Sequence, residues 1–173
     1  MLNSFYNAIF RPSQIRFPRQ AAIAISLLTI FILASNAAAR TNSGIAGAAG
    51  FALLFLFGGT LGWYWLSASI NLIAQLLGGR ADARTTITET AWGLWPLLFT
   101  GVAITAANWS ALLGQLLSWM IVIGVFVTLT IAIRQVYQFG WLKASLCLNI
   151  TLILSLLALS GLFLWPLMIF LGI

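Results

Sequence analysis

Long apolar stretches make up most of this chain. Of 173 residues, 8 are Lys or Arg and 2 are Asp or Glu. Five largely apolar stretches follow one another, at residues 21–39, 44–77, 90–107, 112–133 and 142–171. About 20 consecutive apolar residues are enough for a helix to cross the hydrocarbon core of a bilayer. The pattern predicts an all-α integral membrane protein with a bundle of five transmembrane helices in residues 21–173.

The composition excludes a water-soluble globular protein. Hydrophobic residues make up 62% of the chain and charged residues 6%, whereas soluble domains hold about 45–50% and about 25%. The chain therefore lacks the polar residues that a water-exposed surface needs. The net charge of +6 is spread in small groups, which argues against nucleic acid as a partner and suits basic loops held against anionic lipid heads.

Residues 1–20 form a separate, cytoplasmic segment in this prediction. They carry Arg11, Arg16 and Arg19, and apolar residues recur at helical spacing from Leu2 to Phe10. This pattern predicts a short amphipathic helix in the membrane surface. The stretch 21–39 is either the first anchor or the apolar part of a signal peptide. The long charged region before it favours an uncleaved anchor, because signal peptides have short apolar regions of about 7–15 residues.

The second stretch is too long for one perpendicular crossing. Its 34 residues would form a helix of about 51 Å, against a hydrocarbon core of about 30 Å. We therefore expect a tilt or a break, the break at Gly58-Gly59. Gly58 and Gly62 form a small-xxx-small pair, which predicts a helix-packing face and allows self-association. A polar stripe of Ser67, Asn71 and Gln75 either lies at the membrane interface or faces other helices.

A polar loop is predicted at residues 80–88. Asp82 is a good helix cap, and the run from Thr86 to Glu89 has the spacing of a capping box at the start of the third helix. Pro96 falls inside that third span. A membrane helix tolerates such a proline when neighbouring helices shelter the freed carbonyl.

The basic residues divide unevenly between the two sides of a five-span protein. One side holds Arg11, Arg16, Arg19, Arg80, Arg84, Arg134 and Lys143, and the other side holds only Arg40. Basic loops remain cytoplasmic. The division therefore predicts a cytoplasmic N-terminus, a C-terminus on the opposite side, and five as the number of spans.

The charged residues of this side are the candidate interaction face: Arg80, Asp82, Arg84, Glu89, Arg134 and Lys143. Glu89 and Arg134 are placed near a helix N-terminus and a helix C-terminus, where each complements the helix dipole. Capping and snorkelling therefore explain both residues. The alternative is an ion pair between them that closes the cytoplasmic mouth of the bundle.

Few side chains of this sequence could act in catalysis or bind a metal or cofactor. The chain has no histidine, so imidazole catalysis and histidine ligation of metal or haem are excluded. Its single cysteine, Cys147, lies in an apolar stretch and is interpreted as a packing residue. The two acids lie on one short segment. We therefore expect no enzyme activity, no metal site and no cofactor.

The order of several short motifs resembles the Yip family of membrane proteins, the Ypt/Rab-interacting proteins, in its bacterial branch. The motifs are the run from Phe5 to Pro12, the run Leu76-Leu77-Gly78-Gly79 followed by Ala91 and Pro96, and the run from Ile133 to Tyr137 followed by Lys143-Ala144. The resemblance implies a five-span protein with a cytoplasmic N-terminus. Eukaryotic members are non-enzymatic membrane organisers that bind Rab GTPases and each other through a longer cytosolic N-terminal region.

Three functions are consistent with these observations. The first is a non-enzymatic scaffold that associates with membrane lipids and with other membrane proteins or copies of itself. The second is a small accessory subunit of a larger membrane complex. The third is a small transporter or channel component. The membrane is a bacterial plasma membrane or an internal membrane.

Overall fold

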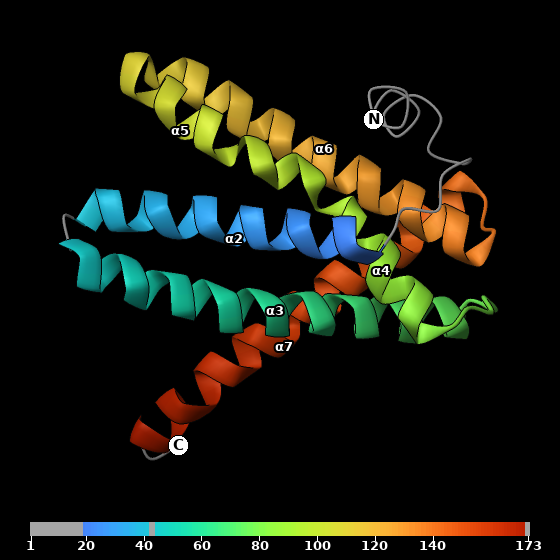
Figure 1. Ribbon diagram of the computed structural model, residues 1–173. Helices are drawn as coiled ribbons and strands as arrows, with labels where there is room; N and C mark the ends of the chain where they lie inside the picture. Colours follow the sequence, from blue (N-terminus) through green and yellow to red (C-terminus); the bar gives the residue numbers. More distant parts are fainter. Residues whose placement is uncertain (1–18, 42–43, 172–173) are drawn as a thin grey trace, which may run out of the picture.

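A computed structural model describes residues 19–41 and 44–171 of the protein (Figure 1). Every element in these ranges is a helix. They are α2 (Arg19–Thr41), α3 (Gly44–Leu76), α4 (Ala83–Gly93), the 3-10 helix η2 (Trp95–Phe99), α5 (Thr100–Trp109), α6 (Ala111–Tyr137) and α7 (Trp141–Leu171). The amphipathic helix predicted within residues 1–20 falls almost entirely on residues 1–18, which lie outside the described residues.

Two antiparallel hairpins form most of the bundle. Helices α2 and α3 make one hairpin, and α5 and α6 make the second beside it (Figure 1). Helix α4 packs against α6, α3 and α2 and so joins the two hairpins. Helix α7 contacts α3 and α6 and then diverges from the bundle toward its C-terminal end (Figure 1).

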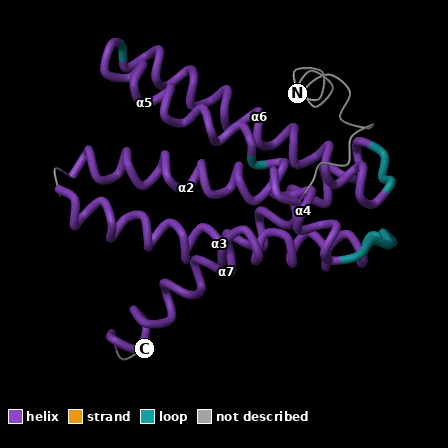
Figure 2. The backbone as a smooth tube through the Cα atoms, viewed as in Figure 1, coloured by secondary structure: helices purple, strands orange, loops and turns teal. Residues whose placement is uncertain are grey.

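The connections gather at two opposite ends of the bundle because successive long helices reverse direction. The connections at residues 77–82 and 138–140 lie at the same end as the start of α2 (Figure 2). We call this the loop end. The tight connection at Ser110 lies at the opposite end (Figure 2). The structure therefore places at one end the two connections in or beside which Arg80, Asp82, Arg84, Arg134 and Lys143 lie.

Four helical segments are long and apolar enough to cross a membrane: Ala49–Leu76, Ala83–Trp109, Ala111–Tyr137 and Trp141–Gly161. Helix α2 contains a shorter apolar stretch, Leu27–Ala38. Large apolar side chains point outward along these helices. Leu142 is 82% exposed and Leu61 is 69% exposed. An apolar exterior of this extent fits lipid and not water, so the prediction of an all-helical membrane protein is confirmed.

The predicted break in the second stretch is wrong. Helix α3 runs without interruption through Gly58-Gly59 over 33 residues. Glycine is more frequent in membrane helices than in soluble ones, and nothing lies within 4 Å of where a Cβ of Gly58 would be. A continuous α3 is about 50 Å long, so it must tilt or extend beyond a hydrocarbon core of about 30 Å.

The start of the third segment also differs from the prediction. Helix α4 begins at Ala83 with Asp82 at the N-cap position, so the predicted polar loop at 80–88 ends early. The side chain of Asp82 makes no capping hydrogen bond. Thr86 is not a cap, because its N–H already donates to the carbonyl of Asp82 at 3.1 Å within the first turn. The predicted capping box from Thr86 to Glu89 is therefore wrong.

Pro96 divides the third segment into α4, η2 and α5. A proline has no N–H to donate and distorts the preceding turn. The N–H of Leu97 donates to the carbonyl of Leu94 at 3.0 Å, and not to that of Gly93 as in an α-helix. The hydroxyl of Thr128, on α6, donates to the carbonyl of Gly93 at 2.6 Å. Thr128 thus satisfies the Gly93 carbonyl, which the 3-10 turn at Pro96 leaves without its α-helical partner Leu97.

The main apolar core lies near the loop end. It combines residues from α3, α6, α7 and the connection between α6 and α7: Ile70, Ile73, Ala74, Leu129, Ile133, Tyr137, Phe139, Ala144, Cys147 and Leu148. Because these residues include the last turns of α3 and α6 and the first turns of α7, the core holds both connections in fixed positions.

Candidate interaction face

The exposed charges of the described residues gather at the loop end. Arg80 and Asp82 lie in the connection between α3 and α4, and Arg84 lies in the first turn of α4. Arg134 lies in the last turn of α6, and Lys143 lies in the first turn of α7. All five side chains are exposed. The structure therefore brings together, at one end, charges that the sequence places in two separate segments.

Two of these cations lie against aromatic rings. The guanidinium carbon of Arg134 is 5.0 Å from the centre of the Trp141 ring. The ammonium nitrogen of Lys143 is 4.7 Å from the centre of the Phe139 ring. Such contacts contribute about 0.5–1 kcal/mol each at exposed sites. They restrict both cations to the surface around the connection between α6 and α7.

Arg134 and Glu89 have different surroundings. Arg134 is in the last turn of its helix, as the dipole argument expects. Glu89 is half-buried in the second turn of α4, so its predicted place at a helix N-terminus is wrong. The reason is the early start of α4 at Ala83. The ion pair between Glu89 and Arg134 stays a prediction.

The connection after α3 is a Schellman motif, a helix ending closed by two hydrogen bonds. The N–H of Gly78 donates to the carbonyl of Gln75 at 2.9 Å, and the N–H of Gly79 donates to the carbonyl of Ala74 at 2.8 Å. Gly78 has a φ of 83°, which glycine adopts without steric cost. Gly79 is buried, and a Cβ added to it would lie 2.7 Å from Cδ1 of Tyr137.

A buried ladder of hydrogen bonds joins three helices beneath the face. It consists of Trp63, Ser67 and Asn71 on α3, Thr86 and Thr90 on α4, and Tyr137 on α6. We call these six residues the polar ladder. Ser67, Thr86 and Thr90 are each at most 2% exposed. The polar ladder therefore lies within the packed part of the bundle.

The hydroxyl group of Tyr137 has one proton, and this decides which group donates in each of its hydrogen bonds. The hydroxyl of Tyr137 donates to Oδ1 of Asn71 at 2.8 Å. Its oxygen is then left to accept the hydroxyl proton of Thr86 at 2.7 Å. One tyrosine thus bridges α3 and α4 from α6. Interhelical hydrogen bonds in membranes contribute about 0.6 kcal/mol each on average.

A second branch of the polar ladder centres on Thr90. Its hydroxyl donates to the carbonyl of Thr86 at 2.8 Å, and its oxygen accepts from the indole N–H of Trp63 at 3.3 Å. The hydroxyls of Thr90 and Ser67 share a hydrogen bond of 2.6 Å, in which either can donate. Hydroxyl, amide and indole groups do not exchange protons readily near neutral pH. The polar ladder is therefore suited to fixing helix positions and not to acid–base chemistry.

Sequence reasoning found only part of the polar ladder. It singled out the stripe of Ser67, Asn71 and Gln75 but left open which way the stripe faces. Ser67 and Asn71 face other helices, whereas Gln75 is exposed. Thr86 and Thr90 are four residues apart, a spacing that indicates a shared helix face. Tyr137 gave no such signal, because its partners lie 51 and 66 residues away along the chain.

Gly58 and Gly62 form an open surface on α3. Both are exposed, and a Cβ at either position would meet nothing within 4 Å. The pair therefore packs against no other described helix of this chain. Self-association through these glycines stays a prediction.

Cys147 is fully buried, with its Sγ 3.8 Å from the carbonyl oxygen of Ile70. It lies in the apolar core, as the packing interpretation expects. Among the described residues no group of three or more His, Cys, Asp or Glu side chains could hold a metal ion.

Comparison with protein families gives a match over nearly the whole chain. The model of the Yip1 domain matches residues 3–170. Comparisons with curated proteins and with solved structures give no significant match. The family match covers nearly all of the chain, including the two glycines of the Schellman motif, Pro96 and the whole interaction face. The resemblance to the Yip family is confirmed, and the chain belongs to the Yip1 domain family. The bacterial branch and the five spans stay predictions.

Proposed function

We propose that this protein is a non-enzymatic organiser of a bacterial membrane that acts by binding lipids and other membrane proteins. In this proposal the loop end is its cytoplasmic interaction face. The observation that carries the proposal is the gathering of Arg80, Arg84, Arg134 and Lys143 as exposed side chains at one end of the bundle. Basic residues beside a membrane attract anionic lipid heads and acidic protein surfaces.

The proposed topology has five spans, with the N-terminus in the cytoplasm and the C-terminus outside. Helix α2 has 23 residues and would be the first crossing. It begins at the loop end and finishes at the opposite end (Figure 1). With α2 counted, the seven basic residues at the N-terminus and in the two loop-end segments share one side, and Arg40 lies on the other. That division is the one expected for a cytoplasmic loop end.

A second candidate function is an accessory subunit of a larger membrane complex. The observation that favours it is the open surface around Gly58 and Gly62, where another helix could approach closely. The exposed aromatic and leucine side chains beside these glycines, including Phe57 and Leu61, add apolar contact area.

The test is a pull-down of the tagged protein from native membranes in mild detergent, with co-purifying proteins quantified by mass spectrometry. Two variants are compared with the wild type. One changes the four loop-end basic residues to Gln, and the other carries Gly58→Leu and Gly62→Leu. The organiser proposal expects partners to be lost in the first variant and retained in the second. The reverse result supports the accessory subunit, and loss in neither variant contradicts both.

A further inference from the structure

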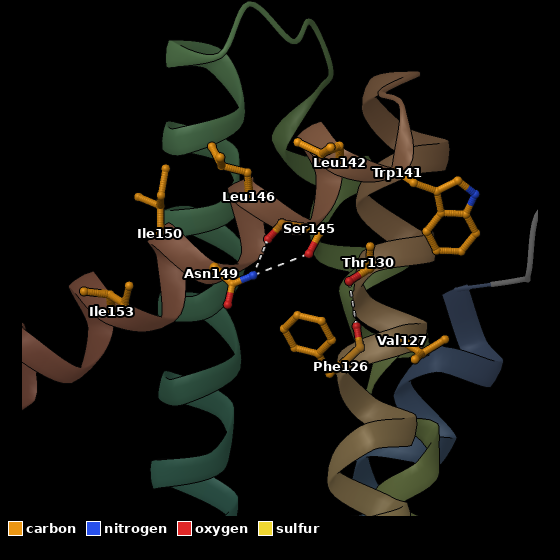
Figure 3. Close-up of a pocket in the computed structure, with 10 residues that line it drawn as sticks. All are labelled: Phe126, Val127, Thr130, Trp141, Leu142, Ser145, Leu146, Asn149, Ile150 and Ile153. Atoms are coloured by element: carbon orange, nitrogen blue, oxygen red, sulfur yellow. Dashed lines mark hydrogen bonds between the residues drawn. The ribbon is translucent and has the colours of Figure 1, made fainter.

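A groove opens between α6 and α7 where these helices diverge (Figure 3). Its volume is about 750 Å³, within the range of about 300–1,000 Å³ typical of small-molecule sites. Phe126 and Thr130 line the α6 side, and Trp141, Ser145 and Asn149 line the α7 side. Figure 3 shows the ring of Phe126 and the side chain of Asn149 facing the space between the two helices.

A cation stands at the loop-end mouth of the groove. Arg134 lies four residues after Thr130 on α6, so the two side chains share one helix face. The guanidinium of Arg134 is exposed and lies 5.0 Å from the ring of Trp141, which is itself part of the groove wall. The groove therefore has a positively charged entrance in a position set by Trp141.

A hydrogen-bond donor lies one turn deeper. The side-chain amide of Asn149 donates to the carbonyl of Ser145 at 2.8 Å and to its hydroxyl oxygen at 3.4 Å (Figure 3). The hydroxyl of Ser145 accepts from Asn149 and keeps its own proton to donate. Ser145 follows Trp141 by four residues, about 6 Å along the helix. Beyond Asn149 the α7 wall is apolar, with Ile150 and Ile153.

We propose that this groove binds one anionic phospholipid. Its phosphate would contact Arg134, an ester carbonyl would accept the proton of Ser145, and an acyl chain would lie against Phe126 and Ile153. The order along the groove (cation, hydrogen-bond donor, apolar wall) matches the order of groups in a phospholipid. A membrane helix from a second copy offers no phosphate for Arg134. The inference rests on the proposed membrane placement, with the loop end at the level of the lipid heads.

Native mass spectrometry of the full-length protein tests this inference. The protein is stripped of lipid in detergent and incubated with equal amounts of phosphatidylglycerol and phosphatidylcholine. One bound phosphatidylglycerol is expected, in preference to phosphatidylcholine. Arg134→Gln should reduce that preference about tenfold, since a hydrogen bond to a charged group contributes enough free energy for such a change. Arg40→Gln is the matched control, because it removes a cation near the end of α2, opposite the loop end and outside the interaction face, and should change little.

A second variant keeps the test independent of charge. Asn149→Phe fills the groove and leaves Arg134 in place, so it should abolish retained lipid while the circular dichroism spectrum stays that of the wild type. The inference is overturned if both lipids bind equally, if Arg40→Gln acts as strongly as Arg134→Gln, or if the protein forms lipid-free dimers that Asn149→Phe disrupts. Side-specific labelling reports the membrane placement separately, so the two claims can fail independently.

Discussion

Tyr137 illustrates how one side chain holds the loop end together. It is 5% exposed and stacks on Phe139, with ring centres 5.6 Å apart. Its hydroxyl bridges Asn71 on α3 and Thr86 on α4. The residue therefore takes part in both the apolar core and the polar ladder. This double role explains how a membrane bundle with few polar residues fixes the position of its connections.

Tyr137→Phe should destabilise the protein by about 1 kcal/mol, because it leaves the amide oxygen of Asn71 without its donor and removes an acceptor from Thr86. Thermal unfolding in detergent measures the effect. Tyr64→Phe is the control, since Tyr64 is 49% exposed and its loss of a hydroxyl should change little. Equal stability of the two variants would show that the polar ladder contributes nothing.

Thr128 and Pro96 form a second testable pair. Thr128→Val should destabilise the protein by about 1 kcal/mol, because it removes the donor to the Gly93 carbonyl, which the 3-10 turn at Pro96 leaves without the N–H of Leu97. In a Pro96→Ala background the N–H of Leu97 can return to that carbonyl, so Thr128→Val should cost less. A double-mutant cycle measures the difference. Additive effects would contradict the proposed compensation.

At the scale of elements, the structure depends on how its helices end. Helix α3 ends in a Schellman motif, in which Gly79 lies against Tyr137 and Phe139. Helix α6 ends at Tyr137 and is followed by Gln138, which has a φ of 55°. Both endings redirect the chain within a few residues, which keeps the loop-end connections short. Because these short connections pack on the apolar core, the basic side chains in and beside them are held in defined positions.

Gly79→Ala should destabilise the protein by about 1–3 kcal/mol, the usual cost of overpacking. The added Cβ would lie 2.7 Å from Tyr137 Cδ1, 2.8 Å from Phe139 Cζ and 2.9 Å from the carbonyl oxygen of Ala74. The last of these is backbone and cannot rotate away. Gly58→Ala on the same helix meets nothing within 4 Å and should not lower the melting temperature. A Gly79→Ala protein as stable as the Gly58→Ala protein would contradict this account.

The sequence predicted the interiors of the helices better than their ends. Apolar runs identify a membrane helix because the bilayer imposes one length and one polarity on every span. The sequence did not reveal the start of α4, because its first turns, from Ala83 to Glu89, are polar and their composition is typical of a loop. The break at Gly58-Gly59 was predicted from glycine content, which does not decide helix continuity in a membrane. Long-range partners, such as Tyr137 with Asn71, depend on packing that no local pattern encodes.

For the molecule as a whole, the stabilising contacts described above are concentrated at one end. The apolar core, the polar ladder and both cation–π contacts lie at or near the loop end, while α7 diverges toward its C-terminal end (Figure 1). This asymmetry fits the proposed orientation, in which the well-packed loop end faces the cytoplasm and the exposed helix surfaces contact lipid. The proposed function therefore depends on which side of the membrane the loop end faces.

The most direct test is side-specific cysteine labelling in intact bacterial cells, in a Cys147→Ala background. Ala83→Cys reports the loop end and Ser110→Cys reports the opposite end, both at exposed positions. An N-terminal epitope tag reports whether α2 crosses. A membrane-impermeant maleimide should label Ser110→Cys in intact cells and Ala83→Cys only after permeabilisation, with the tag also protected until then. Labelling of Ala83→Cys in intact cells, with Ser110→Cys protected, would contradict a cytoplasmic interaction face.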